Sequence, residues 1–203
     1  MNSKNKHKIL VLAESIDIED SSGTKGRVAL IQNLQNIGFE LLVYHYTRKD
    51  IQLSGIKCVE IKEKRRSFLF FLSRIQRHIG YKLGFSLHKP LEKLFGFSFT
   101  LLNDRNSIVQ SLSQIDFRPD LVLTLSKGGS FRPHHAILKL PEFHKKWIAY
   151  IHDPYPMHFY PKPYTWFEAG YKKKEEFMRQ IGEKAAYVAF PSRLLMEWMG
   201  SKI

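Results

Sequence analysis

Short apolar runs alternate with amphipathic stretches along most of the chain. The runs are rich in Val, Ile and Leu, and they cover residues 9–13, 41–46, 56–61, 121–125, 147–151 and 186–190. Apolar runs without polar alternation are typical of strands that are buried on both faces, as in parallel sheets. The pattern therefore predicts an α/β fold, with a Rossmann-like parallel sheet of about six or seven strands flanked by helices.

The clearest helical pattern lies between the first two runs. Gly38 follows it and can end a helix in the left-handed conformation. Strand, helix and strand are then complete within about forty residues, as a βαβ unit requires. A second, charged helical pattern covers residues 168–186. The first pattern is one apolar stripe made of Val28, Leu30, Ile31, Leu34 and Ile37.

Residues 62–100 do not fit this alternation, because apolar and basic side chains are interleaved throughout the segment. A basic amphipathic helix of this kind commonly lies on anionic lipid. The alternative is that its apolar face packs on the sheet while the charges are solvated. On the lipid hypothesis, the predicted membrane contacts are Arg65, Arg66, Phe70, Phe71, Arg74 and Arg77.

Composition adds a strong basic surplus. The 203 residues include 32 Lys and Arg against 19 Asp and Glu, a formal charge of +13. Such an excess indicates an anionic partner: nucleic acid, a phosphorylated substrate or an anionic membrane. The single cysteine, Cys58, excludes an internal disulfide and lies in an apolar run, which predicts a buried, inert thiol.

No stretch approaches the roughly 20 apolar residues of a membrane span. The apolar stretch 9–13 is too short for the core of a signal peptide, and acidic residues follow it directly. We therefore expect a cytoplasmic protein, with peripheral attachment to the inner face of the plasma membrane as a further option.

Ligands of open α/β sheets bind beyond the carboxyl ends of the strands, and three loops fall in that position. The first follows strand 9–13. Its glycines let backbone N–H groups approach a phosphate, but their spacing matches neither the dinucleotide fingerprint nor a Walker A loop. A simple flexible turn is the alternative. The candidate residues are Ser22, Gly23, Thr24, Lys25, Gly26 and Arg27.

The second loop follows strand 121–125 and contains Lys127, Gly128 and Gly129. It exposes backbone at the same edge of the sheet, so it is a second candidate for phosphate or substrate binding. The alternative is a plain helix entry with Ser130 as the N-cap.

The third loop follows strand 147–151 and begins with His152 and Asp153, with Tyr155 close behind. A His-Asp pair at a strand end can orient a ligand hydroxyl or move a proton, so we predict a catalytic role for both residues. The ring of Tyr155 can stack on a sugar. The alternative is that His152 is a structural residue beneath a rigid loop.

Metal and serine-nucleophile chemistry are not expected. His134 and His135 are adjacent and diverge on a helix, and no paired-cysteine or H-E-x-x-H spacing exists. A G-x-S-x-G nucleophile elbow is also missing from the sequence. No metal ligand is therefore assigned.

Several motifs, in order, resemble the N-terminal domain of GT-B glycosyltransferases, most closely the retaining family-4 type. They are KILVL at 8–12, the small-residue loop 22–27, GFELLVY at 38–44, RPDLVL at 118–123, His152-Asp153 and AFPS at 189–192. The likeness covers nearly the whole chain except 62–100. The first loop departs from the family, whose common form has two adjacent glycines.

The resemblance implies a division of labour. The 203 residues would form a single acceptor-side domain, with His152 near the transferred sugar and the first loop near the donor diphosphate. A C-terminal domain, which we expect this chain to lack, would hold a UDP- or GDP-sugar, so the chain alone should not catalyse transfer. No cofactor is expected in the chain itself, and the implied acceptor is a cell-envelope glycan or a lipid-linked sugar.

Two other functions remain open. A non-catalytic, basic Rossmann-like module could bind a polyanion, either nucleic acid or an anionic membrane. No established nucleic-acid motif is present, so nucleic acid is not the expected partner. A nucleotide-binding enzyme of another class, such as a dehydrogenase, is disfavoured by the missing dinucleotide fingerprint.

Overall fold

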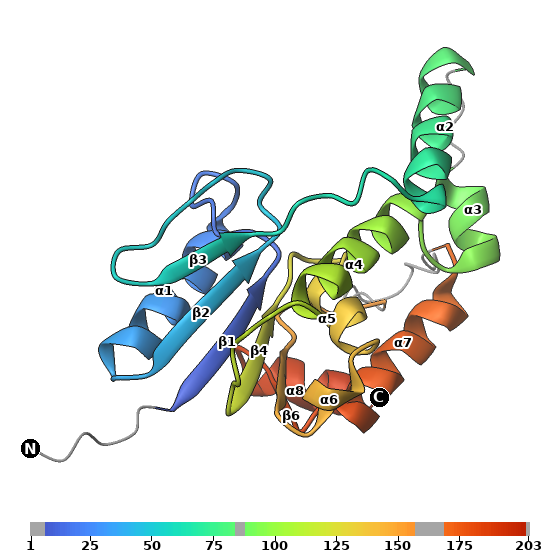
Figure 1. Ribbon diagram of the computed structural model, residues 1–203. Helices are drawn as coiled ribbons and strands as arrows, with labels where there is room; N and C mark the ends of the chain where they lie inside the picture. Colours follow the sequence, from blue (N-terminus) through green and yellow to red (C-terminus); the bar gives the residue numbers. More distant parts are fainter. Residues whose placement is uncertain (1–6, 84–87, 157–168, 202–203) are drawn as a thin grey trace, which may run out of the picture.

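The computed structural model describes residues 7–83, 88–156 and 169–201 (Figure 1). Its strands are β1 Lys8–Ala13, β2 Glu40–His45, β3 Lys57–Glu60, β4 Leu121–Leu125, β5 Trp147–Tyr150 and β6 Tyr187–Ala189. Its helices are α1 Ser22–Asn36, α2 Phe68–Leu83, α3 His88–Phe95, α4 Phe99–Leu112, α5 Arg132–Ile137, α6 Pro141–His144, α7 Tyr171–Lys184 and α8 Arg193–Gly200.

The six strands form one sheet in the order β3-β2-β1-β4-β5-β6, and every neighbouring pair is parallel. All six apolar runs thus form strands, and the predicted α/β Rossmann-like fold is confirmed. In the central strand β1, Leu10 and Val11 point to opposite faces and both are fully buried. This is why the strand is apolar at successive positions instead of alternating.

Helices cover the two faces of the sheet unequally. On one face, Val28 and Ile31 of α1 pack against a cluster that includes Val11 and Val43. On the other face, α4, α5, α6, α7 and α8 contribute to a larger core that contains Trp147. The indole Nε1 of Trp147 donates a 2.9 Å hydrogen bond to Thr124 Oγ1, which satisfies the polar atom in that core.

Helix α1 begins earlier than the sequence suggested. Ser21 is its N-cap and accepts a 3.2 Å hydrogen bond from the Thr24 N–H, so residues 22–27 form helical turns and the predicted loop was wrong there. Gly38 has a φ of +106° just past the helix, as a C-terminal glycine should. Ile37 was predicted in the apolar stripe, but it lies at the C-cap and is 73% exposed.

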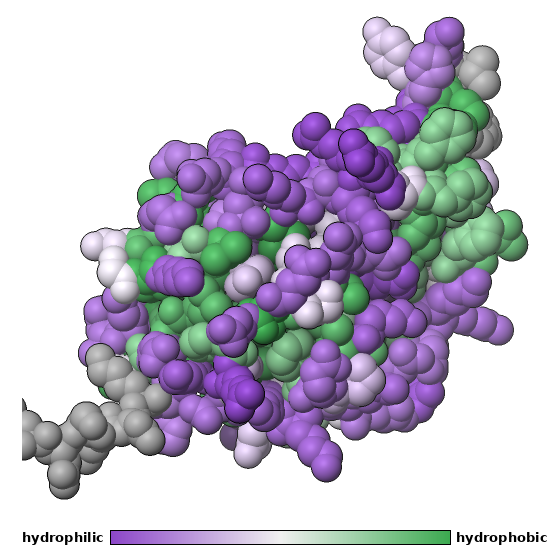
Figure 2. All heavy atoms as spheres, viewed as in Figure 1, coloured by the Kyte–Doolittle hydropathy of each residue, from purple (hydrophilic) through white to green (hydrophobic). Residues whose placement is uncertain are grey.

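The segment 62–100 leaves the sheet altogether. Figure 1 shows α2 projecting from the body of the fold, with α3 beside it. The apolar side of α2 does not pack on the sheet, because Phe68 and Phe71 are 74% and 60% exposed. Figure 2 shows hydrophobic side chains gathered over α2 and α3. In the described part of the chain, no helix combines the length and apolar character that crossing a bilayer requires.

Candidate functional site

The three predicted loops meet at the carboxyl edge of the sheet, where β1, β4 and β5 end. From α1, Arg27 reaches the loop after β4 and donates a 3.0 Å hydrogen bond to the carbonyl of Ser126. The loop after β5 lies against the same loop, because a Cβ built on Gly128 would overlap Asp153 Oδ2. Any larger residue at 128 would displace the Asp153 carboxylate from its present position.

Glu14, the first residue after β1, organises this edge. Its side chain is 3% exposed, and its carboxylate accepts hydrogen bonds from Lys127 N–H at 2.9 Å and from Ser130 Oγ at 2.6 Å. The guanidinium of Arg132 forms an ion pair with the same carboxylate. Three donors thus neutralise a charge that would otherwise be expensive to bury, and they fix the 127–130 loop.

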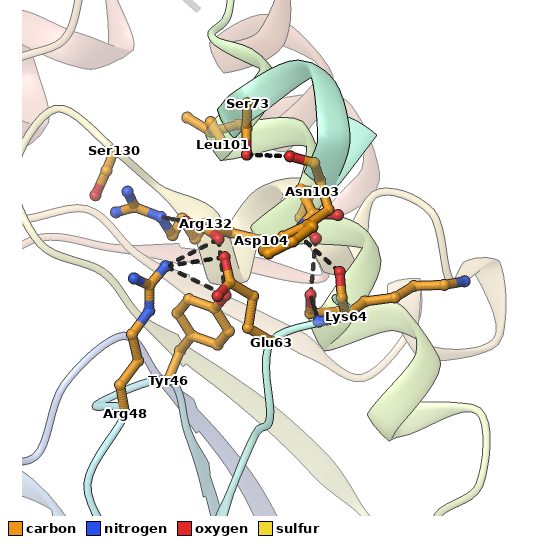
Figure 3. A network of polar contacts seen from close by, with 12 residues as sticks. Tyr46, Arg48, Glu63, Lys64, Ser73, Leu101, Asn103, Asp104, Ser130 and Arg132 are labelled. Carbon is orange, nitrogen blue, oxygen red and sulfur yellow. Dashed lines mark hydrogen bonds and ion pairs between the residues drawn. The ribbon is translucent and has the colours of Figure 1, made fainter. Parts of the chain in front are cut away.

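Arg132 extends the network to α4 (Figure 3). Its Nε donates to Asp104 Oδ2 at 2.7 Å, and Asp104 is fully buried. The other oxygen of Asp104 accepts hydrogen bonds from Tyr46 OH at 2.7 Å and from Arg48 at 3.2 Å. Burial, followed by the charge of Asp104, raises the pKa of Tyr46, so the phenol stays protonated and remains a donor.

The sequence analysis did not assign Glu14, Asp104 or Arg132 to the site. Glu14 was identifiable by the criterion used for His152, since it is a charged residue directly after a buried strand. Asp104 was not, because nothing in the local pattern of α4 shows which helix face meets the loop after β4.

Two of the three cations predicted to hold phosphate, Arg27 and Lys127, are committed to groups of the protein. Arg27 is 4% exposed, and besides Ser126 it contacts Thr24 Oγ1 at 2.7 Å. The Lys127 ammonium is paired with Asp20, whose pKa it lowers by hydrogen bonding. The edge therefore combines satisfied charges with exposed backbone at Gly128 and Gly129, an arrangement suited to a polyhydroxyl ligand.

His152 and Asp153 form a partly exposed pair at this edge. His152 Nε2 lies 3.1 Å from Asp153 Oδ2, and the Asp153 side chain is 47% exposed. Burial lowers the pKa of His152, while the carboxylate of Asp153 opposes that shift, so the imidazole is neutral at pH 7. The 47% exposed carboxylate of Asp153 can bind and orient a hydroxyl group or accept its proton, whereas His152 acts through Asp153, because its Nε2 lies against that carboxylate and its Nδ1 is buried.

A second histidine, His134, lies in the core near this pair. His134 is fully buried, and its Nδ1 lies 2.6 Å from Ser126 Oγ. Burial, with a smaller effect of His152, lowers the pKa of His134 to about 3. His134 is thus a neutral core residue at physiological pH. Over the described residues, no three His, Cys, Asp or Glu side chains gather closely enough to hold a metal ion.

Other site predictions have mixed outcomes. Tyr155 is 3% exposed and packs on Phe131 in the core, with ring centroids 5.1 Å apart, so it is not a surface stacking residue. Ser130 is not an N-cap, since Phe131 holds that position at φ +47° and Ser130 instead bonds Glu14. Ser22, Lys25 and Gly26 are exposed and take no part in the contacts described above, whereas Gly23 lies beside the Arg27 guanidinium.

The predicted membrane contacts differ in their exposure and in their position relative to α2. Phe71, Arg74 and Arg77 are exposed on α2, whereas Phe70 is half-buried beneath Arg74, whose guanidinium carbon lies 4.7 Å from the ring centroid. Arg65 and Arg66 precede the helix and line a groove against α4.

Comparisons with known proteins found few similarities to this chain. No protein-family model and no curated protein matches its sequence. Among solved structures, a glycosyltransferase from Rickettsia africae ESF-5 is similar over 76% of this chain, with a TM-score of 0.37 and 14% identity. The chain spans only 32% of the length of that structure.

Proposed function

We propose that this chain is the acceptor-binding half of a glycosyltransferase that moves a sugar from a nucleotide-sugar donor to a cell-envelope glycan or lipid-linked acceptor. The observation that carries the proposal is the His152–Asp153 pair at the carboxyl edge of the parallel sheet, 3.1 Å apart, with the Asp153 side chain 47% exposed. The ordered motifs that resemble a GT-B N-terminal domain support it.

In this function, Asp153, positioned by neutral His152, holds an acceptor hydroxyl while the exposed backbone of Gly128 and Gly129 contacts the sugar ring. A UDP- or GDP-sugar is held mainly by a second domain, and the start of α1 approaches its diphosphate. Transfer is of the retaining kind, in which stabilisation of the leaving diphosphate matters most. The chain alone then binds acceptor weakly and transfers nothing.

A glycan array tests the acceptor role. We expect the chain to retain a subset of oligosaccharides, and His152→Ala and Asp153→Asn to abolish that binding. The matched controls are His7→Ala and Asp116→Asn, which change exposed residues outside the edge and should bind as the parent does. Failure to retain any saccharide, or equal binding by all four variants, would rule out the acceptor site.

A transfer assay tests the division of labour. The chain is incubated with UDP- and GDP-sugars and with each saccharide that it retains, and product is measured by mass spectrometry. We expect none, because donor contacts from a second domain are required for the transition state. Robust turnover by the 203 residues would overturn this part of the proposal.

The acceptor role includes docking of α2 on an anionic bilayer. Phe68, Phe71 and Ile75 lie on one side of the helix, are 74%, 60% and 37% exposed, and offer apolar area to lipid. Arg74 and Arg77 are exposed on the same helix, so the basic charge complements anionic headgroups. This arrangement would bring a lipid-linked acceptor to the domain.

A further inference from the structure

A groove of about 850 Å³ lies between the segment that follows β3 and the outer face of α4. The segment lines it with four cations within five residues: Lys62, Lys64, Arg65 and Arg66. This groove is separate from the His152–Asp153 pair, and the cations at 62 and 64 have had no role so far.

These four side chains differ from the cations of the sheet edge, because they are exposed and unengaged. Across residues 7–83, 88–156 and 169–201, none of the four lies within ion-pair distance of a carboxylate. The nearby carboxylate of Glu63 pairs instead with Arg48 and Arg74, each at 3.9 Å. Together with Arg48, the cations of the groove outnumber its two carboxylates, Glu60 and Glu63, and a net positive charge in a concave surface attracts anions.

The segment is held in place from beneath. Lys64 N–H donates to Ser107 Oγ at 2.8 Å, and Asn103 Nδ2 donates to the Lys64 carbonyl at 3.3 Å. Ser67 Oγ also donates to Asn103 Oδ1, at 2.6 Å. Figure 3 shows the Lys64 side chain extending away from this network. Because the backbone is fixed, little of it has to be ordered when a ligand binds.

The opposite wall is polar and uncharged. Gln110, Ser111 and Gln114 of the α4 region line it, and the Gln110 and Gln114 side chains are exposed. Amide and hydroxyl groups can donate to and accept from sugar hydroxyls. No aromatic ring is among the described residues that line the groove, so it has no platform on which nucleic-acid bases could stack.

We propose that this groove binds an acidic saccharide, an oligosaccharide that carries carboxylate or phosphate groups. On the proposed function, on which this identification rests, the saccharide is the extended part of the acceptor whose terminal hydroxyl lies at His152. The cations hold the acidic groups, and the α4 amides hold the ring hydroxyls between them.

The test is an NMR titration of the ¹⁵N-labelled chain with a hyaluronan hexasaccharide, and with maltohexaose as a neutral saccharide of equal length. We expect the acidic saccharide to shift the amides of Lys64, Arg65 and Ser111 and the neutral one to bind much more weakly. Raising the salt concentration from about 0.05 M to about 0.5 M should raise the Kd for the acidic saccharide roughly tenfold or more.

Two fourfold variants provide the matched comparison. Lys62→Gln, Lys64→Gln, Arg65→Gln and Arg66→Gln together should raise the Kd for hyaluronan about tenfold or more. The control replaces Lys57, Lys139, Lys145 and Lys184 by Gln; these lysines are exposed, and the change in net charge is identical. Its Kd should stay within about twofold of the parent value.

Three results would overturn the groove proposal: equal binding of maltohexaose, equal weakening by both variants, or tighter binding of a duplex DNA of matched charge at the same amides. Saccharide-induced shifts at Gly128, Gly129 and Asp153 that the groove variant leaves unchanged also overturn it, while the acceptor site stands. If the saccharide shifts the groove amides but not those of Gly128, Gly129 and Asp153, the result supports the groove proposal and contradicts the acceptor role of His152.

Discussion

Arg132 Nε donates a 2.7 Å hydrogen bond to Asp104 Oδ2, and this bond joins the loop after β4 to helix α4. Asp104 is fully buried and accepts from Tyr46 and Arg48 as well, so its charge is satisfied on every side. Arg132 carries the connection on to Glu14. The geometry of the candidate site therefore depends on a helix that contributes nothing to its exposed surface.

Removal of this carboxylate should be strongly destabilising. Asp104→Ala leaves Arg132 and Arg48 without a shared partner, and breaking a buried ion pair in this way costs about 3–5 kcal/mol. We expect the free energy of unfolding in urea to fall by about that amount. Asp116→Ala, at an exposed position, should change it by less than about 0.5 kcal/mol. A loss below about 1 kcal/mol for Asp104→Ala would contradict the network's importance.

Alanine substitution should have different effects at two glycines, Gly128 and Gly26. In Gly128→Ala the new Cβ overlaps Asp153 Oδ2, so the carboxylate must move away from His152. Because Asp153 raises the pKa of His152 against the lowering by burial, that pKa should fall further. Gly26→Ala lies within α1 with nothing within 4 Å of its Cβ, and it should stabilise the fold by about 0.5–1 kcal/mol.

The measurement for this pair is a ¹³C NMR titration of the His152 imidazole, with urea unfolding alongside. An unchanged His152 pKa in Gly128→Ala would show that Asp153 does not depend on the glycine. A destabilised Gly26→Ala would show that α1 does not contain that position as described.

Acid should destabilise the protein well before its carboxylates titrate. The pKa of His134 is about 3 in the fold against an ordinary value of 6.5, so below pH 6.5 the unfolded chain binds a proton that the folded chain does not. Stability then falls with falling pH, by about 1.4 kcal/mol per pH unit for each such group. Burial lowers the pKa in the same direction for His45, His135 and His152.

Urea unfolding at a series of pH values between 6.5 and about 5 measures how steeply the free energy of unfolding changes with pH. We expect His134→Gln to reduce this pH dependence by the contribution of about one proton, whatever the variant's stability at pH 7. A slope that His134→Gln leaves at the parent value would mean that His134 titrates normally in the fold.

Lipid binding is expected to depend on α2. Vesicles of phosphatidylcholine with phosphatidylglycerol should bind the chain at low salt, whereas pure phosphatidylcholine should bind it weakly. Phe68→Ser with Phe71→Ser should lower partitioning about tenfold or more, because two apolar side chains are lost. The control, Ile37→Ser with Leu194→Ser, alters residues that are 73% and 70% exposed elsewhere. Equal binding to both lipids, or equal loss in both variants, would contradict docking through α2.

The sequence predicted the sheet well because both faces of its strands are buried. Successive apolar residues such as Leu10 and Val11 are then required, and they are visible without any tertiary information. The ligand edge could also be placed, since the carboxyl ends of parallel strands lie together, and the structure brings Arg27 against Ser126 and Gly128 against Asp153 there.

The errors came from local choices that depend on single hydrogen bonds or on the path of the chain. Residues 22–27 look like a glycine loop until the cap at Ser21 is known. Tyr155 looks like a surface ring, but the chain turns it onto Phe131. For α2, the amphipathic pattern was correct, yet no pattern within one helix shows whether a neighbour covers its apolar side.

The charged side chains from Arg74 through Glu63, Arg48, Asp104 and Arg132 to Glu14 alternate in sign, and each internal member serves two opposite charges. Substitutions along this row are consequently not independent: the energetic effect of one depends on whether its neighbours are intact. The base of the projecting helix is thus coupled through charges to the end of the central strand, although no backbone hydrogen bond joins α2 to β1 in the part of the chain described.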